Sequence, residues 1–286
     1  MTRVRISAGL LLFLIKYTLT NFEQSSYFLI PLQNCFFGVW MKIAIIGYGK
    51  MGKIIQKIAH DRLHDVITID PIQKADFKEI NSDSLENVDV CIDFTVPSVA
   101  LENARACATL GKNVVMGTTG WYDKTDEMKE ITKDIGFIWS GNFSIGVNMF
   151  FKIVEEASKV VNNVPEYDVS VFEAHHNMKK DSPSGTANMI ANKVLENISQ
   201  KDTIVTDKFD RAPKKNELHV ASMRCGKIPG IHTVTFDNDA DTIELKHSAR
   251  NREGFALGAV LAAEFLEGKK GFFDINDLMK DIIGGN

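Results

Sequence analysis

The strongest constraint on the fold is a glycine loop, Gly47-Tyr48-Gly49-Lys50-Met51-Gly52, that follows the apolar residues 43–46. An apolar run without alternation is typical of a parallel strand that is buried on both faces. After the loop, Ile54, Ile55 and Ile58 recur at the spacing of one helix face. Such glycines allow a tight turn and let the backbone at a helix N-terminus approach a pyrophosphate, so the segment predicts the first unit of a dinucleotide-binding domain.

The alternation of strand and helix continues to about residue 139. A helix over residues 98–110 is expected to end at Gly111, a typical C-terminal glycine. The further apolar strands are expected at residues 66–69, 88–94, 113–116 and 137–139. This order predicts an α/β fold with a parallel, doubly wound sheet.

The pattern changes after about residue 144, where a long helix is expected over residues 147–161. Later segments alternate in residue type between short turns, as strands do when one face is solvated or covered by a partner. These strands are expected at residues 168–173, 218–223, 232–236 and 242–247, and two closing helices at residues 255–266 and 275–283. The second half therefore predicts a mixed-sheet α+β domain.

The composition sets only broad limits on function. A length of 286 residues is enough for two domains, and a net charge of -4 gives no general argument for nucleic acid or an anionic membrane as partner. The cysteines Cys35, Cys91, Cys107 and Cys225 form no CxxC pair. We interpret all four as reduced core thiols of a cytoplasmic protein, and expect neither a disulfide framework nor a zinc site.

The first 40 residues differ in character from the rest. Arg3 and Arg5 precede the apolar residues 8–15, which imitates the start of a signal peptide. The run is too short to span a bilayer, and no clear small-residue cleavage site follows it. We interpret residues 1–40 as an N-terminal extension whose start codon is assigned upstream of Met41. The alternative is a genuine targeting segment.

Asp70 ends the second expected strand, 18 residues after Gly52, where a carboxylate can accept hydrogen bonds from ribose hydroxyls. An acid there repels a 2′-phosphate, and neither Pro71 nor Gln73 carries a positive charge that would offset this repulsion. The nearest cation along the chain is Lys74. The sequence thus favours NADH over NADPH, with NADPH possible. The alternative is a glycine turn whose acid caps a helix and holds no ligand.

A second set of reactive side chains lies within residues 173–186. His175 and His176 can exchange protons near neutral pH, and Lys179 can donate a proton or hold a carboxylate. For either histidine alone, a structural role at the end of a strand is the better interpretation. No metal ion is expected, because HHxxK lacks the ligand spacing of HExxH and places a cation beside any bound ion.

Ser184, Gly185 and Thr186 precede a further expected helix, so their N–H groups and hydroxyls can bind an anion. The apolar face of that helix comprises Ala187, Ile190, Ala191, Val194, Leu195 and Ile198. Two other segments, residues 93–97 and 117–120, follow strands, and ligands of open α/β sheets bind at the carboxyl ends of strands. The alternative for Ser184 is a helix cap without a ligand.

The motifs GYGKMG, IDFTVP, GTTG, NFSIGVN and EAHHNMKKDSPSGTA, in this order, resemble the dihydrodipicolinate reductase family from about Met41 to the C-terminus. The resemblance implies the NAD(P)H-dependent reduction of 4-hydroxy-tetrahydrodipicolinate, with loss of water, in the diaminopimelate route to lysine. It also implies a dinucleotide-binding domain at residues 41–143 and 252–286, and a substrate-binding domain at residues 144–251 whose sheet forms a homotetramer. This chain departs from many members through its shorter glycine loop and through Pro71 after the acid.

The resemblance also implies roles for individual residues. His175 resembles the proton-handling histidine, and Lys179 the proton donor to the substrate ring. The expected substrate contacts are His176, Ser184, Gly185, Thr186 and Thr119. The expected cofactor contacts are Gly47, Gly49, Lys50, Met51, Gly52, Asp70, Phe94, Thr95, Gly117, Thr118, Thr119, Asn142 and Phe143. The competing interpretations are another nicotinamide enzyme on this fold, such as a semialdehyde dehydrogenase, and a non-catalytic NAD-binding sensor.

Overall fold

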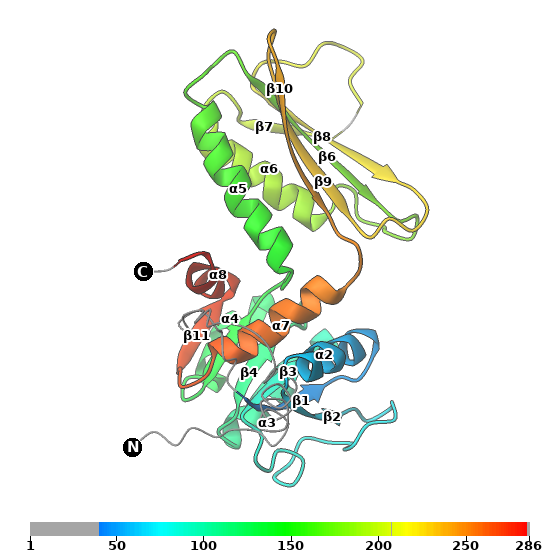
Figure 1. Ribbon diagram of the computed structural model, residues 1–286, viewed down its shortest axis with the longest axis vertical. Helices are drawn as coiled ribbons and strands as arrows, with labels where there is room; N and C mark the ends of the chain where they lie inside the picture. The colour runs from blue at the N-terminus through cyan, green and yellow to red at the C-terminus, as the bar shows by residue number, and fades with distance from the viewer. Residues whose placement is uncertain (1–39, 207, 285–286) are drawn as a thin grey trace, which may run out of the picture. The chain divides into compact units, whose positions relative to one another are not determined.

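The computed structural model describes residues 40–206 and 208–284, so the interpretations of residues 1–39 and of Cys35 lie outside it. The chain divides into two compact units, one of residues up to Phe143 together with those from Ala256 onward, the other Ser144–Phe255. Figure 1 shows the elements of each unit. Among the described residues, no helix has both the length and the hydrophobicity to cross a bilayer.

The first unit contains a sheet in which every strand pair is parallel, as predicted. Its strand order is β11-β5-β4-β3-β1-β2. The strands are β1 (Lys42–Ile46), β2 (Asp65–Ile69), β3 (Val90–Asp93), β4 (Asn113–Met116), β5 (Gly136–Trp139) and β11 (Gly271–Asp274). The last of these was not predicted, because four residues between two helices read as a connection. Phe272 of β11 stacks on Phe137 of β5 with 4.9 Å between ring centroids.

Helices cover both faces of this sheet, because successive strand residues point to opposite sides. The helices are α2 (Lys50–Asp61), α3 (Ala100–Thr109), α4 (Thr125–Ile131), α7 (Glu253–Phe265) and α8 (Ile275–Gly284), with short 3-10 turns at Pro97–Val99 and Tyr122–Lys124. Ala44 and Cys91 share a buried cluster with Ala104 of α3 and Met128 of α4. Gly52 of α2 packs instead against Ile45, which points to the other side.

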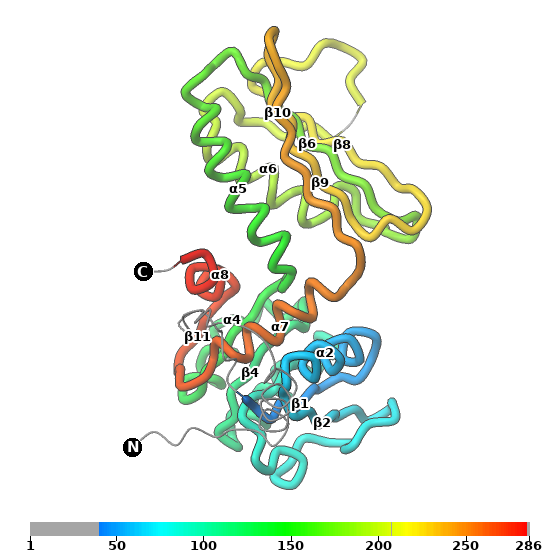
Figure 2. Tube along the Cα trace, in the orientation of Figure 1, coloured from blue at the N-terminus to red at the C-terminus, as the bar shows by residue number. Residues whose placement is uncertain are grey.

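The second unit is a mixed sheet with two helices on one face, which confirms the prediction. Its strands run in the order β10-β9-β6-β8-β7, with β6 parallel to β8 and antiparallel to β9. The strands are β6 (Asp168–His175), β7 (Thr203–Val205), β8 (Glu217–Arg224), β9 (Ile231–Asp237) and β10 (Thr242–Ser248), and the helices are α5 (Ile145–Val161) and α6 (Gly185–Asn197). Figure 2 shows the two helices side by side along the sheet. Strand β7 was not predicted.

The core of the second unit lies between these helices and the sheet. Phe151 and Val154 of α5 and Ile190 and Val194 of α6 share one buried cluster with the inward residues of the strands. The apolar face predicted for α6 is therefore the face that it buries. Burying side chains of this size contributes about 1.5–3 kcal/mol each.

The prediction for the cysteines holds in part. Cys91 and Cys107 are buried free thiols of the first unit. Cys225 is a free thiol too, but it is exposed, so its interpretation as a core residue was wrong. The physical reason is its position one residue beyond β8, in a turn that leaves the sheet and that no element covers.

Candidate active site

The glycine loop between β1 and α2 has the form expected of a pyrophosphate site. Gly47 has φ +92°, and a Cβ there would lie 2.4 Å from the carbonyl oxygen of Phe94. A Cβ on Gly52 would lie 2.3 Å from the carbonyl oxygen of Gly47. Gly49 has open space around it and caps α2 without a side-chain hydrogen bond, so the first N–H groups of the helix are available to an anion.

The carboxylate of Asp70 lies beside this loop at the end of β2. Its Oδ2 accepts a hydrogen bond from Tyr48 N at 2.8 Å, and its Oδ1 accepts from the backbone N–H groups of Ile72 and Gln73. Burial raises the pKa of Asp70, but the three backbone hydrogen bonds and the charge of Lys78 together lower it below its ordinary value. The side chain is thus a carboxylate at neutral pH, next to the loop as predicted.

Lys78 is a cation near Asp70 that the sequence alone did not indicate. Its ammonium group donates to the carbonyl oxygen of Gln73 at 2.7 Å, and it lies 3.4 Å from that of Asp70. Lys74, selected by its distance along the chain, makes no such contact among the described residues. The chain turns back after β2, so that Phe77 pairs with Ile69, and this turn brings residue 78 to the strand end.

Asp93 at the end of β3 organises the loops that follow β3 and β4. Its buried carboxylate accepts hydrogen bonds from Thr118 Oγ1 at 2.6 Å, from Asn103 Nδ2 at 2.7 Å, and from the hydroxyl and N–H of Thr95. Burial raises the pKa of Asp93, and these hydrogen bonds oppose that rise. The sequence marks residues 93–97 only as a segment after a strand and gives no individual role to Asp93 or Asn103, since a fixed loop position shows no pattern along the chain.

The other expected cofactor residues gather at the same edge of the sheet. A Cβ on Gly117 would lie 2.2 Å from the ring of Phe94. The ring centroids of Phe94 and Phe143 are 6.4 Å apart. Thr119 is exposed on the loop after β4, and Asn142 N donates to Ser140 Oγ in the loop after β5. Carboxyl ends of parallel strands share one edge, which explains why segments distant in sequence meet there.

The second candidate site lies on the inward face of β6. Val169 and Val171 of this strand belong to the hydrophobic core, whereas the next two inward positions are Glu173 and His175. Residues two apart on a strand share a face, so the chain places a carboxylate and an imidazole where the core would otherwise continue. The Glu173 side chain is 0% exposed.

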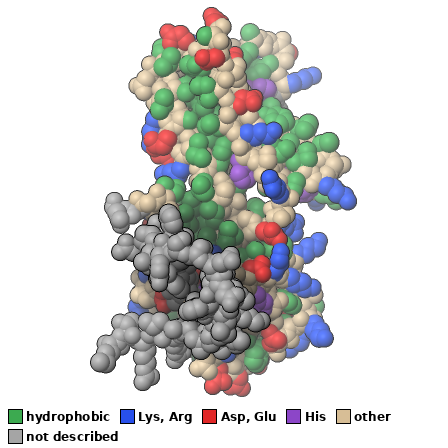
Figure 3. Space-filling model, in the orientation of Figure 1, with side chains coloured by type: hydrophobic (Ala, Val, Ile, Leu, Met, Phe, Trp, Pro, Cys, Tyr) green, Lys and Arg blue, Asp and Glu red, His purple; other side chains and the backbone are tan. Residues whose placement is uncertain are grey.

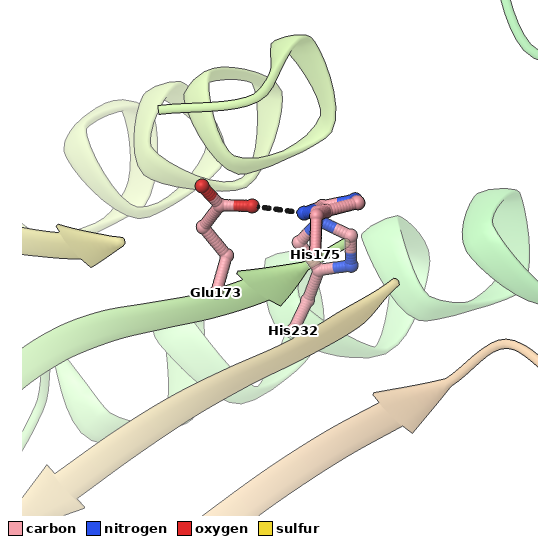
Figure 4. Close-up of side chains that lie close together, drawn as sticks. All are labelled: Glu173, His175 and His232. Carbon is pink, nitrogen blue, oxygen red and sulfur yellow. Dashed lines mark hydrogen bonds and ion pairs between the residues drawn. The ribbon is translucent and has the colours of Figure 1, made fainter. Parts of the chain in front are cut away.

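Glu173 and His175 form a hydrogen-bonded pair, drawn in Figure 4 between Glu173 Oε2 and His175 Nδ1. On the other side, Arg224 Nη2 lies 2.8 Å from Glu173 Oε1, close enough for an ion pair although the N–H is not well aligned. Burial raises the pKa of Glu173, but Ser222, Arg224 and His175 together lower it. Burial lowers the pKa of His175, and Glu173 opposes this effect.

His232 of β9 completes the group and points toward His175 (Figure 4). Its Nε2 lies 3.3 Å from Ser184 Oγ, while its buried Nδ1 has no hydrogen-bond partner among the described residues. Ser184 caps α6 by accepting from Ala187 N at 3.1 Å. The hydroxyl of Ser184 is therefore already used. Gly185 is exposed, with open space where a side chain would stand, and a hydrogen bond from its backbone contributes to lowering the pKa of Asp181.

Lys179 lies in the loop after β6, with its ammonium group 2.8 Å from Asp181 Oδ2. Its positive charge contributes to lowering the pKa of both His175 and His232. Arg224 fixes the same loop by donating to the carbonyl oxygen of Asp181 at 2.6 Å. His176 and Thr186 are half-buried and close to these residues along the chain, but neither side chain hydrogen-bonds to the group among the described residues.

The ligand atoms of Glu173, His175 and His232 lie within 4.8 Å of one another, a separation that a metal ion could bridge. Two observations argue against that use. Both Glu173 oxygens already face His175 and Arg224, and the cations Arg224 and Lys179 would repel a bound metal ion. Glu173 and His175 are therefore a hydrogen-bonded pair, and His232 stands beside them with its ring edge-on to that of His175.

A dinucleotide loop in one unit and a buried group of proton-exchanging side chains in the other define an oxidoreductase that uses a nicotinamide cofactor. Residues 41–143 match the family model "Dihydrodipicolinate reductase, N-terminus", and residues 146–279 match "Dihydrodipicolinate reductase, C-terminus". The chain belongs to the dihydrodipicolinate reductase family. This membership confirms the NAD(P)H-dependent enzyme class expected from the sequence, and argues against the alternative of an unrelated dehydrogenase on the same fold.

Individual relatives agree with this assignment. A protein from Christiangramia forsetii is 39% identical over 246 residues, covering 85% of this chain and 99% of its own. One from Archaeoglobus fulgidus is 36% identical over 265 residues, covering 84% of this chain and all of its own. Both are named 4-hydroxy-tetrahydrodipicolinate reductase. The dipicolinate-bound dihydrodipicolinate reductase of Paenisporosarcina sp. TG-14 shares the fold, with TM-score 0.66 and 22% identity over 83% of this chain and 99% of its own.

Proposed function

We propose that the protein reduces 4-hydroxy-tetrahydrodipicolinate to tetrahydrodipicolinate, with release of water, in the diaminopimelate route to lysine. The observation that carries the proposal is the hydrogen-bonded pair of Glu173 and His175 beside Lys179. This pair lies in the segment that matches the C-terminal family model. A sensor that only binds NAD would need the glycine loop but not this group.

The reaction requires the substrate ring to lose water and give a conjugated imine, then to gain a hydride on one carbon and a proton on its neighbour. The nicotinamide supplies the hydride when it is bound. His175 and Lys179 are the two groups that can pass a proton at this site. The proton comes from solvent, and the electron pair arrives with the hydride, so both side chains are restored after each turnover.

The substrate's carboxylates need positive partners. The ammonium group of Lys179 offers one, and the N-terminus of α6, a helix that begins at Gly185, offers N–H groups and the positive end of its dipole. Ser184 contributes by shaping this end of the helix through its cap. Holding the ring in this way is mostly positioning and electrostatics.

For the cofactor, we propose a preference for NADH over NADPH with Asp70 as its cause. An ionised Asp70 can accept hydrogen bonds from ribose hydroxyls and repels a 2′-phosphate. Lys78 nearby reduces that repulsion, so the expected preference is only about tenfold, or on the order of a kcal/mol. The residues of the glycine loop and of the loops after β3, β4 and β5 would complete the cofactor contacts.

We also propose a homotetramer formed through the second unit, and a cytoplasmic location. Phe172 of β6 and Met223 of β8 are exposed on the sheet face that the helices do not cover. Hydrophobic side chains reach the surface of this unit in the view of Figure 3. Light scattering of the purified protein tests the assembly, and Phe172→Glu should dissociate it.

The activity test uses purified protein, NADH, and substrate made in situ by the preceding synthase. A fall in absorbance at the NADH band supports the reductase. Tight NADH binding without any turnover, by contrast, would support a sensor and overturn the proposal.

A further inference from the structure

Glu173 is a buried ion in the middle of a hydrophobic core face. The residues before it on this face, Val169 and Val171, are apolar, and its own side chain is 0% exposed. A buried carboxylate is costly unless it is paired, and a pair often gives no net stability over apolar residues. The fold therefore keeps Glu173 at an energetic disadvantage, and the group that benefits is its hydrogen-bond partner, His175.

On the basis of the proposed reductase function, we propose that Glu173 is a positioning residue that holds His175 in the tautomer with its proton on Nδ1. This arrangement leaves Nε2 as the nitrogen that exchanges protons with the substrate. An ionised carboxylate can only accept hydrogen bonds, so the Nδ1 that faces Glu173 Oε2 must carry the proton. In a neutral imidazole the other nitrogen is then an acceptor.

Arg224 keeps Glu173 in the ionised state that this requires. Its guanidinium lies 2.8 Å from Glu173 Oε1, and strand pairing sets Arg224 of β8 level with His175 of β6. The other charged or titratable groups that face His175 are His232 on β9 and Lys179 in the following loop. Neither side chain pairs with the Glu173 carboxylate among the described residues, because Lys179 is paired with Asp181 and His232 Nε2 lies near Ser184 Oγ.

The surroundings of Nε2 leave it free. A Cβ on Gly230 would lie 3.1 Å from this nitrogen, so the glycine keeps one side of the ring uncrowded. Nδ1 makes the hydrogen bond found for this ring among the described residues. The turn that carries Gly230 is tied to β6 through the N–H of Cys225, which donates to the His175 carbonyl at 2.8 Å.

The substitution Glu173→Gln should reverse the tautomer of His175, and this change can be measured. Arg224 has only donors, so the amide oxygen of the glutamine would face Arg224 and its NH₂ would face His175 Nδ1. His175 would then have to carry its proton on Nε2. In a Ser-His-Asp triad the corresponding amide gives the wrong tautomer and lowers kcat by about 10⁴.

The experiment combines NMR with kinetics on the full chain labelled with ¹⁵N-histidine. The His175 signals are identified by their loss in His175→Asn, and long-range ¹⁵N–¹H couplings report the tautomer. We expect the Nδ1–H form in the wild type, the Nε2–H form in Glu173→Gln, and a kcat at least about a hundredfold lower in the variant, with the KM for NADH unchanged. Glu217→Gln is the matched control, because Glu217 is a buried carboxylate paired with Arg211 at the opposite end of β8.

A wild-type His175 in the Nε2–H form overturns the proposal, and this measurement does not depend on whether Glu173→Gln folds. A kcat for Glu173→Gln equal to that of wild type also overturns it, as does an unchanged tautomer in that variant or an equal loss in Glu217→Gln. If the wild type does not turn over the substrate at all, the proposed function fails, whereas the NMR measurement still reports the Glu173–His175 pair.

Discussion

His232 lies directly opposite Glu173 in the antiparallel pair of strands β9 and β6. The ring of His232 stands edge-on to that of His175, with 5.2 Å between the centroids. Burial, and then the charge of His175, lower the pKa of His232 to about 4. The site therefore holds a neutral imidazole beside a histidine–carboxylate pair at neutral pH, which limits the positive charge around Lys179.

This low pKa predicts a loss of stability in weak acid. The unfolded chain, with a histidine pKa of 6.5, takes up a proton before the folded chain does, so stability is full above about pH 6.5 and is lost as the pH falls to about 4. The loss is at most about 3 kcal/mol. Of the charged and titratable groups that face His232, His175, His247 and Lys179 lower its pKa, whereas Glu173 raises it.

Thermal unfolding at several pH values between 7 and 4 measures this dependence. His232→Gln cannot take up the proton, so its melting temperature should fall less over this range than that of the wild type. Identical pH dependences for the two proteins would show that His232 does not titrate in the way described.

Lys179→Ala should lower kcat by about a hundredfold or more while leaving the KM for NADH nearly unchanged. The reason is that Lys179 lies beside His175 and His232 in the second unit, whereas the glycine loop belongs to the first. Steady-state kinetics with varied NADH and substrate provide the measurement. Lys180→Ala removes an exposed neighbouring charge and serves as control. A kcat equal in both variants would remove Lys179 from the mechanism.

Asp70→Ala should weaken NADH binding and narrow the gap between the two cofactors. It removes both the acceptor for ribose hydroxyls and the charge that repels a 2′-phosphate, and it frees the N–H of Tyr48. Values of kcat/KM for NADH and NADPH at one ionic strength give the ratio. Lys78→Ala, which removes the nearby cation, should widen the gap instead. A ratio that stays constant across both variants would mean that another residue determines the choice.

A protein that starts at Met41 should fold and keep its activity. Strand β1 begins at Lys42, and Met41 is itself fixed, since its carbonyl oxygen accepts from Asp65 N at 3.0 Å and its side chain is buried. The comparison is of melting temperature and kcat between the shortened and the full chain. Aggregation or loss of activity on shortening would instead assign residues 1–40 to the fold.

The sequence predicted those parts of the molecule whose signal is local. The run from β1 to α2 combines apolar residues, glycines and helical spacing within about twenty residues, so strand, loop and helix were all predicted correctly. The apolar face of α6 was predicted for the same reason. Strands β7 and β11 were missed because three or four residues give no periodicity and, unlike the equally short β4 and β5, they lie outside the alternation of strand and helix that the sequence shows up to residue 139; each forms by pairing with a distant neighbour.

In the candidate site, too, the residues with a local sequence signal were predicted and those brought in from distant strands were not. His175 and Lys179 stand in one short motif, but Arg224 and His232 reach it from β8 and β9 through strand pairing. Nothing in their own surroundings along the chain marks them. Glu173 could have been found, since a Glu-x-His pair that continues the alternation of Val169 and Val171 places both side chains on one face.

Strand β11 has a consequence for how the chain is made. The sheet of the first unit gains its outer strand from Gly271–Asp274, so a ribosome must synthesise nearly all of the 286 residues before that sheet is complete. Until then β5 is an open edge, which can pair with other chains. The second unit takes its strands from one continuous stretch and can close earlier. We expect nascent chains halted before Gly271 to resist protease in the second unit and to be cut in the first, so that the unit begun first is finished last.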